Sequence, residues 1–198
     1  MEFHSQAGQD QFIFRIAVEG SGKTDGTFVD IGCSHPIILS NTYALECCGW
    51  RGLLVDSSPD EGIEVRKVRK SPFILADGAT LDWDKAFADH GHADAKTIDY
   101  LSFDVDGSAT DVFAAMPWRR VRFGLLTVEH DSWRFGLEPR RQMREALQAL
   151  GYDLLCPDVS NLGVQFEDWW VDPQGVYASV AERFRTTEST DWSEIVRR

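Results

Sequence analysis

Short apolar runs, separated by longer segments with helical periodicity, recur along most of the chain. Within these runs the apolar residues are mostly continuous and do not alternate strictly with polar ones, which is typical of parallel strands covered on both faces. Most of the runs end at an acidic residue. The five predicted strands are Thr27–Ile31, Leu53–Val55, Phe73–Ala76, Ile98–Phe103 and Phe123–Val128.

The segments between these runs carry helix start and stop signals. Serine can cap a helix, proline fits its first turn, and glycine commonly ends it. In the last of these segments, apolar residues recur on one stripe. The predicted helices are Asn41–Cys48 between Ser40 and Gly49, one starting at Ser58-Pro59, one after Ser108, and Leu137–Leu150 before Gly151.

The pattern changes after Gly151. Tyr152–Cys156 and Gly163–Val171 are predicted strands, joined only by the polar link Pro157–Leu162. Because this link has no room for a helix, the two strands should pair antiparallel as a hairpin. The element order predicts an α/β fold whose mostly parallel sheet ends in an antiparallel edge.

The length of 198 residues suits one domain. We expect residues 1–25 to form an N-terminal helical or lid segment. Residues 26–172 should form the core sheet, and residues 173–198 a C-terminal helix or a tail. Residues 1–198 then make up one domain.

A formal net charge of −12 disfavours a nucleic-acid partner and favours a neutral or cationic small substrate. The basic run at Arg119, Arg120 and Arg122 is interpreted as a solvated turn. The four cysteines lack zinc or CxxC spacing and are expected to be reduced thiols. With no signal-peptide pattern and no membrane-spanning run, the expected location is cytoplasmic, and a homodimer is compatible with the sequence.

Polar residues gather where the predicted parallel strands end. Ligands bind beyond the carboxyl ends of the strands in such sheets, so these residues should share one cleft. They are Asp30 and Gly32, then Asp56, then Asp77 and Gly78, then Asp104 and Asp106, and finally Glu129, His130 and Asp131.

The turn after the first strand lacks the full G-x-G-x-x-G fingerprint, because Ser34 and Ile37 stand at the later glycine positions. This counts against a dinucleotide whose pyrophosphate rests on a helix start. Asp56 follows Gly32 by 24 residues (56 − 32), a spacing that suits a ribose-binding acid, although it could instead cap the helix near Ser58. Asp77 could accept a hydrogen bond from an adenine amino group or belong to a plain Asp-Gly turn.

In order along the chain, several stretches resemble the FkbM family of methyltransferases over about residues 5–155. They are Ser5-Gln6-Ala7-Gly8-Gln9-Asp10, Gly26–Gly32, Leu39–Glu46, Gly49–Gly52, Tyr100–Gly107 and Thr127–His130. The chain departs from the family at Cys33-Ser34-His35-Pro36, and at Asp56, where glutamate is more usual.

The resemblance implies a Rossmann-like class I methyltransferase with a seven-stranded sheet. It also implies an S-adenosylmethionine donor and O-methylation of a sugar, glycan or polyketide-like small molecule. By this resemblance Asp30, Gly32 and Asn41 lie near the methionine part, Asp56 holds the ribose and Asp77 faces the adenine, with Gln6 or Gln9 over the cofactor. The expected cofactor-binding residues are Gln9, Asp30, Gly32, Cys33, Ser34, Asn41, Asp56, Ser57, Asp77, Gly78 and Asp104.

A hydroxyl is a poor nucleophile, so a base or a metal ion must assist methyl transfer. His130 is the expected base, although it could instead cap a loop carbonyl; His35 is a secondary candidate. Asp104, Glu129 and His130 could together hold Mg²⁺, Mn²⁺ or Zn²⁺, and these three are the expected catalytic residues.

Two other segments could take part in binding. Phe166–Trp170 could bind a sugar face or a cation, or form an amphipathic edge strand or a dimer contact. His90-Gly91-His92 is interpreted as a loop. The competing functions are a nicotinamide-dependent oxidoreductase and a non-catalytic nucleotide-binding module on the same fold.

Overall fold

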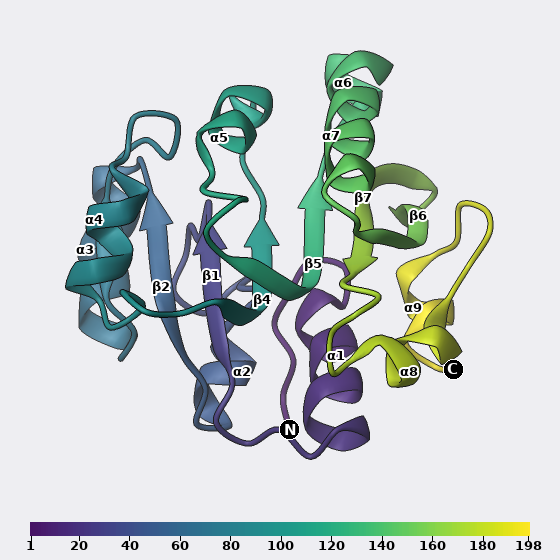
Figure 1. The fold of residues 1–198 in the computed structure, drawn as a ribbon, viewed down its shortest axis with the longest axis horizontal. Coiled ribbons are helices and arrows are strands. Elements are labelled where there is room, and N and C mark those ends of the chain that lie inside the picture. Colours follow the sequence, from purple (N-terminus) through teal and green to yellow (C-terminus); the bar gives the residue numbers. More distant parts are fainter.

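The computed structural model describes all residues, 1–198, and contains one seven-stranded sheet with the order β3-β2-β1-β4-β5-β7-β6 (Figure 1). Strands β1 to β5 run parallel, and β7 runs antiparallel to both of its neighbours. The strands are β1 Thr27–Ile31, β2 Arg51–Asp56, β3 Phe73–Leu75, β4 Thr97–Phe103, β5 Arg122–Glu129, β6 Asp153–Asn161 and β7 Val164–Val171. The predicted fold class is confirmed.

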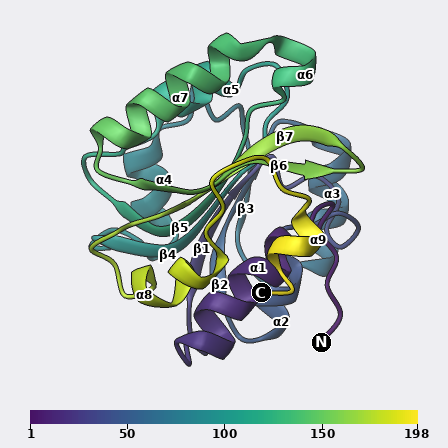
Figure 2. The same cartoon turned by 90° about the vertical axis from the view of Figure 1, so that its right-hand side faces the viewer.

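Helices cover both faces of the sheet (Figure 2). One face packs against α4 Trp83–Asp89, α5 Ala109–Ala115 and α7 Leu137–Ala149. The other packs against α1 Gln9–Ile13, the π-helical segment Phe14–Gly20, α2 Tyr43–Cys47 and α3 Pro59–Val68. Each face has its own buried apolar cluster, of 21 and 22 residues respectively, so the sheet forms the middle of three layers. We call these the α7 face and the α1 face.

Local sequence explains where the helices begin. Pro59 stands at the start of α3, and the Ser40 hydroxyl accepts from the backbone N–H of Tyr43 (3.2 Å) at the start of α2. Helix α4 was not predicted. It begins where the Asp82 side chain accepts from the Lys85 N–H (2.9 Å), and it buries Trp83 and Phe87. The Asp82–Lys85 spacing was the available signal.

The hairpin turn is shorter than predicted. Strand β6 continues through Pro157 to Asn161, so the turn consists only of Leu162 and Gly163, with φ of 52° and 81°. Positive φ at both central residues is the type I′ geometry that matches strand twist. Pro157 is accommodated because β6 is an edge strand whose pairing with β7 shifts register around it.

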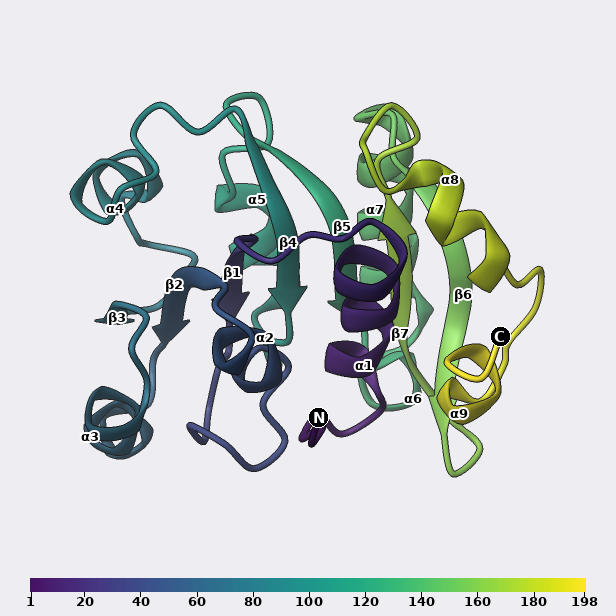
Figure 3. The ribbon, with the colours of Figure 1, turned by 90° about the horizontal axis from the view of Figure 1, so that it is seen from below.

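Both terminal segments belong to the core on the α1 face. Phe12, Ile13 and Ile16 are completely buried, and so are Phe184 and Ile195. The C-terminal segment forms short helices, α8 Ala178–Ala181, a 3₁₀ turn Glu182–Phe184 and α9 Trp192–Ile195. Figure 3 shows α1 against the sheet, with α8 and α9 beside β6. Within residues 1–25, the helical part is residues 9–20, and residues 173–198 carry three short helical segments.

None of the helices combines the length and the apolarity needed to cross a membrane.

Candidate active site

A row of polar side chains lies on the α1 face at the carboxyl ends of the strands. Side chains alternate between the two faces along a strand, and register fixes which of them are neighbours. Asp30 of β1 pairs with Ser102 of β4, which pairs with Thr127 of β5. Two residues further along, Asp104 follows β4 and Glu129 ends β5. The carboxylates predicted at these strand ends are therefore brought to one region.

The turn after β1 requires glycine at position 32. Gly32 has φ of +79°, and a Cβ built on it would lie 1.7 Å from the backbone oxygen of Asp104. The loops after β1 and β4 therefore touch at this point. Only a residue without a side chain allows that approach.

A cavity of about 460 Å³ opens at this edge of the sheet. Its volume is in the usual range for a small-molecule site. Six of its 21 lining residues are acidic, and none is lysine, arginine or histidine. The acids are Asp30, Asp56, Glu61, Asp77, Asp104 and Asp106. We call this space the acidic pocket.

Asp30 is held at the base of the acidic pocket by a buried network. Its carboxylate accepts from the Thr42 hydroxyl (2.6 Å), and Thr42 in turn accepts from the buried guanidinium of Arg69 (2.9 Å). Burial raises the pKa of Asp30 to about 6, and the Thr42 hydrogen bond and Arg69 limit that rise. Arg69 also pairs with the buried Glu46 (3.2 Å), so the network ties α2 to the end of α3.

Asn41 extends the network toward β4. Its Nδ2 donates to the Ser102 hydroxyl (3.1 Å) and to Asp104 (3.4 Å). Its Oδ1 is buried and has no hydrogen-bond partner, although the residue lines the acidic pocket. A buried acceptor without a partner is costly, so this atom is suited to a donor on a ligand.

Asp56 and Asp77 shape the far side of the pocket. Asp56 accepts from the backbone N–H groups of Ser34 (2.8 Å) and Ser58 (2.7 Å), so it joins the loops after β1 and β2. It thus also acts at the start of α3, the alternative considered from the sequence. Asp77 accepts from the Ala79 N–H (2.9 Å) in a turn. Each carboxylate oxygen has two lone pairs, so both residues retain acceptor capacity.

Asp104 and Glu129 form a buried carboxyl pair. Burial and the neighbouring Asp104 raise the pKa of Glu129 to about 11, so Glu129 holds a proton at neutral pH. Burial also raises the pKa of Asp104, and this effect outweighs the hydrogen bonds from Glu129 and Asn41, which lower it. Two carboxyl groups this close cannot both ionise readily. Glu167, the register partner of Glu129 on β7, is a third buried acid whose pKa burial raises, and the sequence singled it out only as part of the segment Phe166–Trp170.

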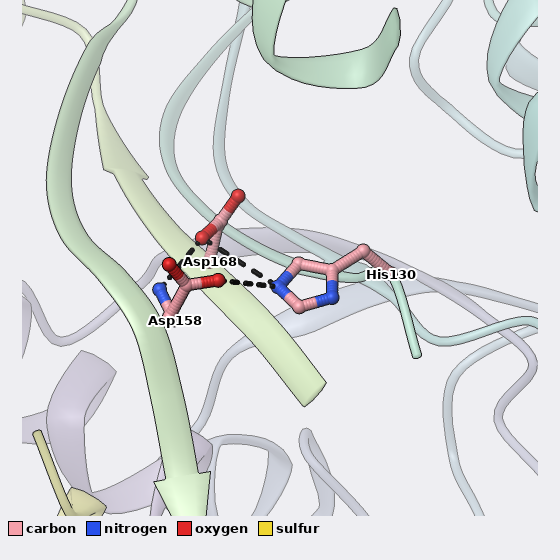
Figure 4. A group of neighbouring side chains, drawn as sticks. All are labelled: His130, Asp158 and Asp168. Atoms are coloured by element: carbon pink, nitrogen blue, oxygen red, sulfur yellow. Dashed lines mark hydrogen bonds and ion pairs between the residues drawn. The ribbon is translucent and has the colours of Figure 1, made fainter. Parts of the chain in front are cut away.

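His130 lies on the other face of the sheet. Its Nε2 is 3.5 Å from Oδ1 of Asp158 and 3.7 Å from Oδ1 of Asp168, and its Nδ1 accepts from the Ser132 N–H (3.2 Å) (Figure 4). Burial lowers the pKa of His130, but the two aspartates outweigh burial and raise it. Successive residues of a strand point to opposite faces, so the His130 side chain, directly after the end of β5, points away from that of Glu129.

The expected metal triad of Asp104, Glu129 and His130 is therefore not assembled. His130 instead groups with Asp158 and Asp168, whose ligand atoms lie within 4.8 Å of one another. Arg144 binds both oxygens of Asp168 (2.7 and 2.6 Å), and Arg140 pairs with Asp158. Two guanidinium groups already neutralise these carboxylates, so the cluster is an ion-pair network joining α7 to the hairpin. The Arg140–Arg144 spacing on one helix face was its sequence signal.

Ten of the eleven expected cofactor-binding residues line the acidic pocket, and Gln9 does not. The Gln9 side chain is buried and accepts from the Ala7 N–H (2.9 Å), whereas Gln6 lines the pocket. The lining residues that the sequence did not single out include Glu61, Ser108 and Val105.

The interpretation of Phe166–Trp170 as a ligand platform, edge strand or dimer contact was wrong. Strand β7 lies inside the sheet, between β5 and β6. Phe166, Trp169 and Trp170 are buried against the helices on either side.

The sheet order and the antiparallel end are those of the Rossmann-like class I fold of S-adenosylmethionine-dependent methyltransferases. Within this class, the methyltransferase FkbM domain matches residues 58–154. This match, over 97 of the 198 residues (154 − 58 + 1), confirms the resemblance seen in the sequence.

Solved structures share the fold at low sequence identity. A TehB-like SAM-dependent methyltransferase from Corynebacterium glutamicum matches with TM-score 0.55 and 12% identity, covering 84% of this chain and 88% of that one. A putative rRNA methylase from Clostridium thermocellum matches with TM-score 0.57 and 11% identity, covering 87% of this chain and 97% of that one. An O-methyltransferase from Bacillus cereus in complex with SAH matches with TM-score 0.55 and 12% identity, covering 86% of this chain and 84% of that one. No curated protein matches the sequence.

Proposed function

We propose that this protein transfers the methyl group of S-adenosylmethionine to a hydroxyl of a sugar-like, glycan or polyketide-like small molecule. The observation that carries the proposal is the acidic pocket, which collects six carboxyl groups and no cationic side chain at the carboxyl ends of the parallel strands. Such a lining suits a ligand bearing an ammonium and a sulfonium. It repels a pyrophosphate, which argues against the nicotinamide alternative.

The pocket has features that fit the donor. Gly32 allows the loops after β1 and β4 to meet at the pocket, and the unpartnered Oδ1 of Asn41 can accept from an ammonium. Asp30 and Asn41 would hold the methionine part, Asp56 the ribose hydroxyls and Asp77 the adenine amino group. The other side chains proposed to contact the donor are Cys33, Ser34, Ser57, Gln6 and, through its backbone, Gly78.

A second cavity, of about 180 Å³, adjoins the acidic pocket at Val105, which lines both. Glu129, Asp131, Thr110 and Phe135 are among its nine lining residues. We place the acceptor here and call this space the acceptor cavity. An acceptor bound in it lies beside Asp104 and Glu129, where a proton must be removed.

The chemistry requires one base. With the bound donor supplying an electrophilic methyl group, the acceptor oxygen forms the new bond to carbon as the carbon–sulfur pair returns to sulfur. Asp104 accepts the hydroxyl proton, because its raised pKa makes it a better base than an ordinary aspartate. Glu129, already protonated, donates to Asp104 and positions it. His130 also lines the acceptor cavity, but its Nε2 lies toward Asp158 and Asp168 and its Nδ1 accepts from the Ser132 N–H, so we assign the role of base to Asp104 and not to His130.

Calorimetric titration with S-adenosylhomocysteine and with NAD tests the donor assignment. We expect S-adenosylhomocysteine to bind and NAD not to bind. Asp56→Ala should weaken the binding about tenfold or more, because one charge-assisted hydrogen bond contributes ~1.5–3 kcal/mol. Asp94→Ala, which removes an exposed carboxylate outside both cavities, is the matched control. Binding of NAD in place of S-adenosylhomocysteine would refute the assignment.

Isotope-labelled S-adenosylmethionine and a pool of hydroxylated small molecules test the reaction. We expect labelled methyl ethers as products. Asp104→Asn should lower kcat by ~10²-fold or more while the protein still binds S-adenosylhomocysteine. A protein that binds the donor but labels no acceptor would favour the non-catalytic module.

A further inference from the structure

A third cavity lies at the opposite end of the sheet from the acidic pocket. Thr27 and Arg51, the first residues of β1 and β2, line it, whereas Ile31 and Asp56, the last residues of these strands, line the acidic pocket. Its volume of about 510 Å³ is in the usual range for a small-molecule site. We call this space the basic cavity, because four of its twelve lining residues are arginine, lysine or histidine. They are Arg51, Lys70, His90 and His92.

The basic cavity holds cations that no acid of the chain neutralises. Glu46 is its one acidic lining residue, and its carboxylate already pairs with Arg69 (3.2 Å) and accepts from the backbone N–H groups of Lys70 and Ser71 (2.9 Å each). The side chains of Arg51 and Lys70 are exposed and form no ion pair, although most cations of this acidic chain do. Two permanent charges therefore remain for an anion from outside.

The loop after α4 brings two imidazoles to the same space. His90-Gly91-His92 follows α4 directly, and the His92 ring is buried with its centroid 6.2 Å from that of Phe87. Burial lowers the pKa of His92, and the nearby His90 and Arg51 lower it further. Cationic groups that disfavour one another's charge are thus gathered around one cavity, and an anion bound among them would relieve this repulsion.

The donors of the basic cavity match a phosphate group. A guanidinium binds two phosphate oxygens through its fork of N–H groups, and an ammonium binds as a point charge. The Ser71 hydroxyl accepts from the Gly52 N–H (3.3 Å), so its own O–H is free to donate. A phosphate monoester offers three strong acceptor oxygens and a charge of about −1.5 to −2 at pH 7. The cavity exceeds the ~150 Å³ that accommodates a benzene molecule, so it also has room for a ring attached to the phosphate.

We propose that the basic cavity binds a phosphorylated small molecule, whose phosphate lies among Arg51, Lys70 and the two imidazoles of the loop after α4. This site is separate from the acidic pocket, and it does not depend on the proposed methyl transfer. A phosphate group on a nucleic acid is disfavoured as the ligand, because the net charge of −12 repels a polyanion.

Calorimetric titration of the full chain with glucose 6-phosphate, glucose and inorganic phosphate tests the site. We expect glucose 6-phosphate to bind about tenfold more tightly than inorganic phosphate, because its ring adds contacts, and glucose not to bind measurably. Raising the ionic strength should weaken the binding, because salt screens charges at a partly exposed site.

Three outcomes of this titration overturn the proposal. Glucose that binds as tightly as its phosphate would show that the cations are not the recognition element. Inorganic phosphate that binds as tightly as the ester would show that the site takes a free anion and not a phosphorylated molecule. No binding of either phosphate would show that the cavity is not an anion site.

Arg51→Gln and Lys70→Gln locate the binding. Each should weaken the affinity for glucose 6-phosphate about tenfold or more, because each removes a charge-assisted hydrogen bond. Both side chains are exposed and without ion pairs, so the variants should fold as the wild type does. Affinity that is unchanged in both variants would contradict the proposal.

Arg119→Gln is the matched control, because Arg119 is exposed, forms no ion pair and does not line the basic cavity. It should leave the affinity for glucose 6-phosphate unchanged, and a loss equal to that of Arg51→Gln would indicate only a general attraction to surface charge. S-adenosylhomocysteine should bind all three variants as it binds the wild type, because none of these residues lines the acidic pocket. Failure of the donor assignment is thereby seen separately from failure of the basic cavity.

Discussion

At the residue scale, the alternation of side chains along β5 decides which acids can take part in the chemistry. Glu129 points to the α1 face with Asp104, whereas His130 points to the α7 face with Asp158 and Asp168. The side chains of these sequence neighbours thus have different partners, although both residues line the acceptor cavity at the end of β5. A polar residue two positions away along the strand is a better partner than its direct neighbour.

Gly32→Ala should abolish donor binding. The added Cβ would meet the Asp104 backbone at 1.7 Å, which is a clash beyond the cost of the positive φ itself. Calorimetry with S-adenosylhomocysteine measures the loss, and circular dichroism checks folding. Gly22→Ala is the control, because Gly22 also has positive φ (+70°) but nothing within 4 Å of its Cβ position. Equal effects in the two variants would show that backbone strain alone, and not close approach, governs position 32.

Glu129→Gln should change how stability depends on pH. The folded state keeps a proton on Glu129 up to a pKa of about 11, whereas an unfolded glutamate releases it near 4.5. The folded state therefore binds more protons over this range, and the wild type loses stability as pH rises through it. In Glu129→Gln, position 129 does not titrate, so this position causes no loss of stability as pH rises.

Melting temperatures at several pH values check this expectation. The melting temperature of Glu129→Gln relative to the wild type should rise steadily from acidic to alkaline pH. Glu188→Gln, which changes an exposed residue, should show no such trend. A constant difference between variant and wild type would contradict the raised pKa.

At the element scale, the sequence specified most of the sheet and less of what surrounds it. Continuous apolar runs gave the five parallel strands within one or two residues at each end, because burial on both faces leaves little room for polar residues. Helix α4 was missed, although the Asp82 side chain that caps it was an available signal. The hairpin turn was misplaced because Pro157 was interpreted as a break, although an edge strand tolerates proline.

The candidate site was predictable to the same degree. Acids at strand ends located the acidic pocket, since strand ends of a parallel sheet share one edge. The partners of those acids depend on register and on the covering helices, so Thr42, Arg69 and Glu167 could not be assigned from sequence patterns. The acceptor cavity likewise depends on how the segment after β5 lies against residues 105–110, which follow β4.

Arg144→Met should destabilise the packing of α7 on the hairpin. It would leave the buried carboxylate of Asp168 without its bidentate partner, at a cost of about 3 kcal/mol or more. For a protein of this size that corresponds to a fall in Tm of roughly 6 °C or more. Arg141 lies three residues before Arg144 on α7 and is exposed. Arg141→Met breaks ion pairs only with Glu138 and Glu145 and should change Tm little. Similar Tm values for the two variants would indicate that the buried network contributes nothing.

At the scale of the whole molecule, the two ends of the chain are held by one cluster. Phe12 of α1 contacts Trp169 of β7 and Phe184 of the C-terminal segment, with ring centroids 4.2 and 5.7 Å apart. Residues far apart in sequence thus depend on one another, and the terminal segments are parts of a single cooperative unit.

Phe184→Ala should therefore lower the stability of the entire protein. Removing a fully buried phenylalanine costs about 3–5 kcal/mol. Differential scanning calorimetry should show one transition at a lower temperature in the variant. An early separate transition, with the main one unshifted, would show instead that residues 173–198 unfold on their own.

The two rims of the sheet have a consequence for how copies of this protein can meet. At one rim β3 is only three residues long, and at the other β6 carries Pro157, irregular pairing and a bridge from Ser160 to Asp191. Neither edge strand therefore presents a long row of unpaired backbone N–H and C=O groups to a strand of another molecule. Both rims therefore disfavour edge-to-edge pairing of two copies of this chain into one continuous sheet.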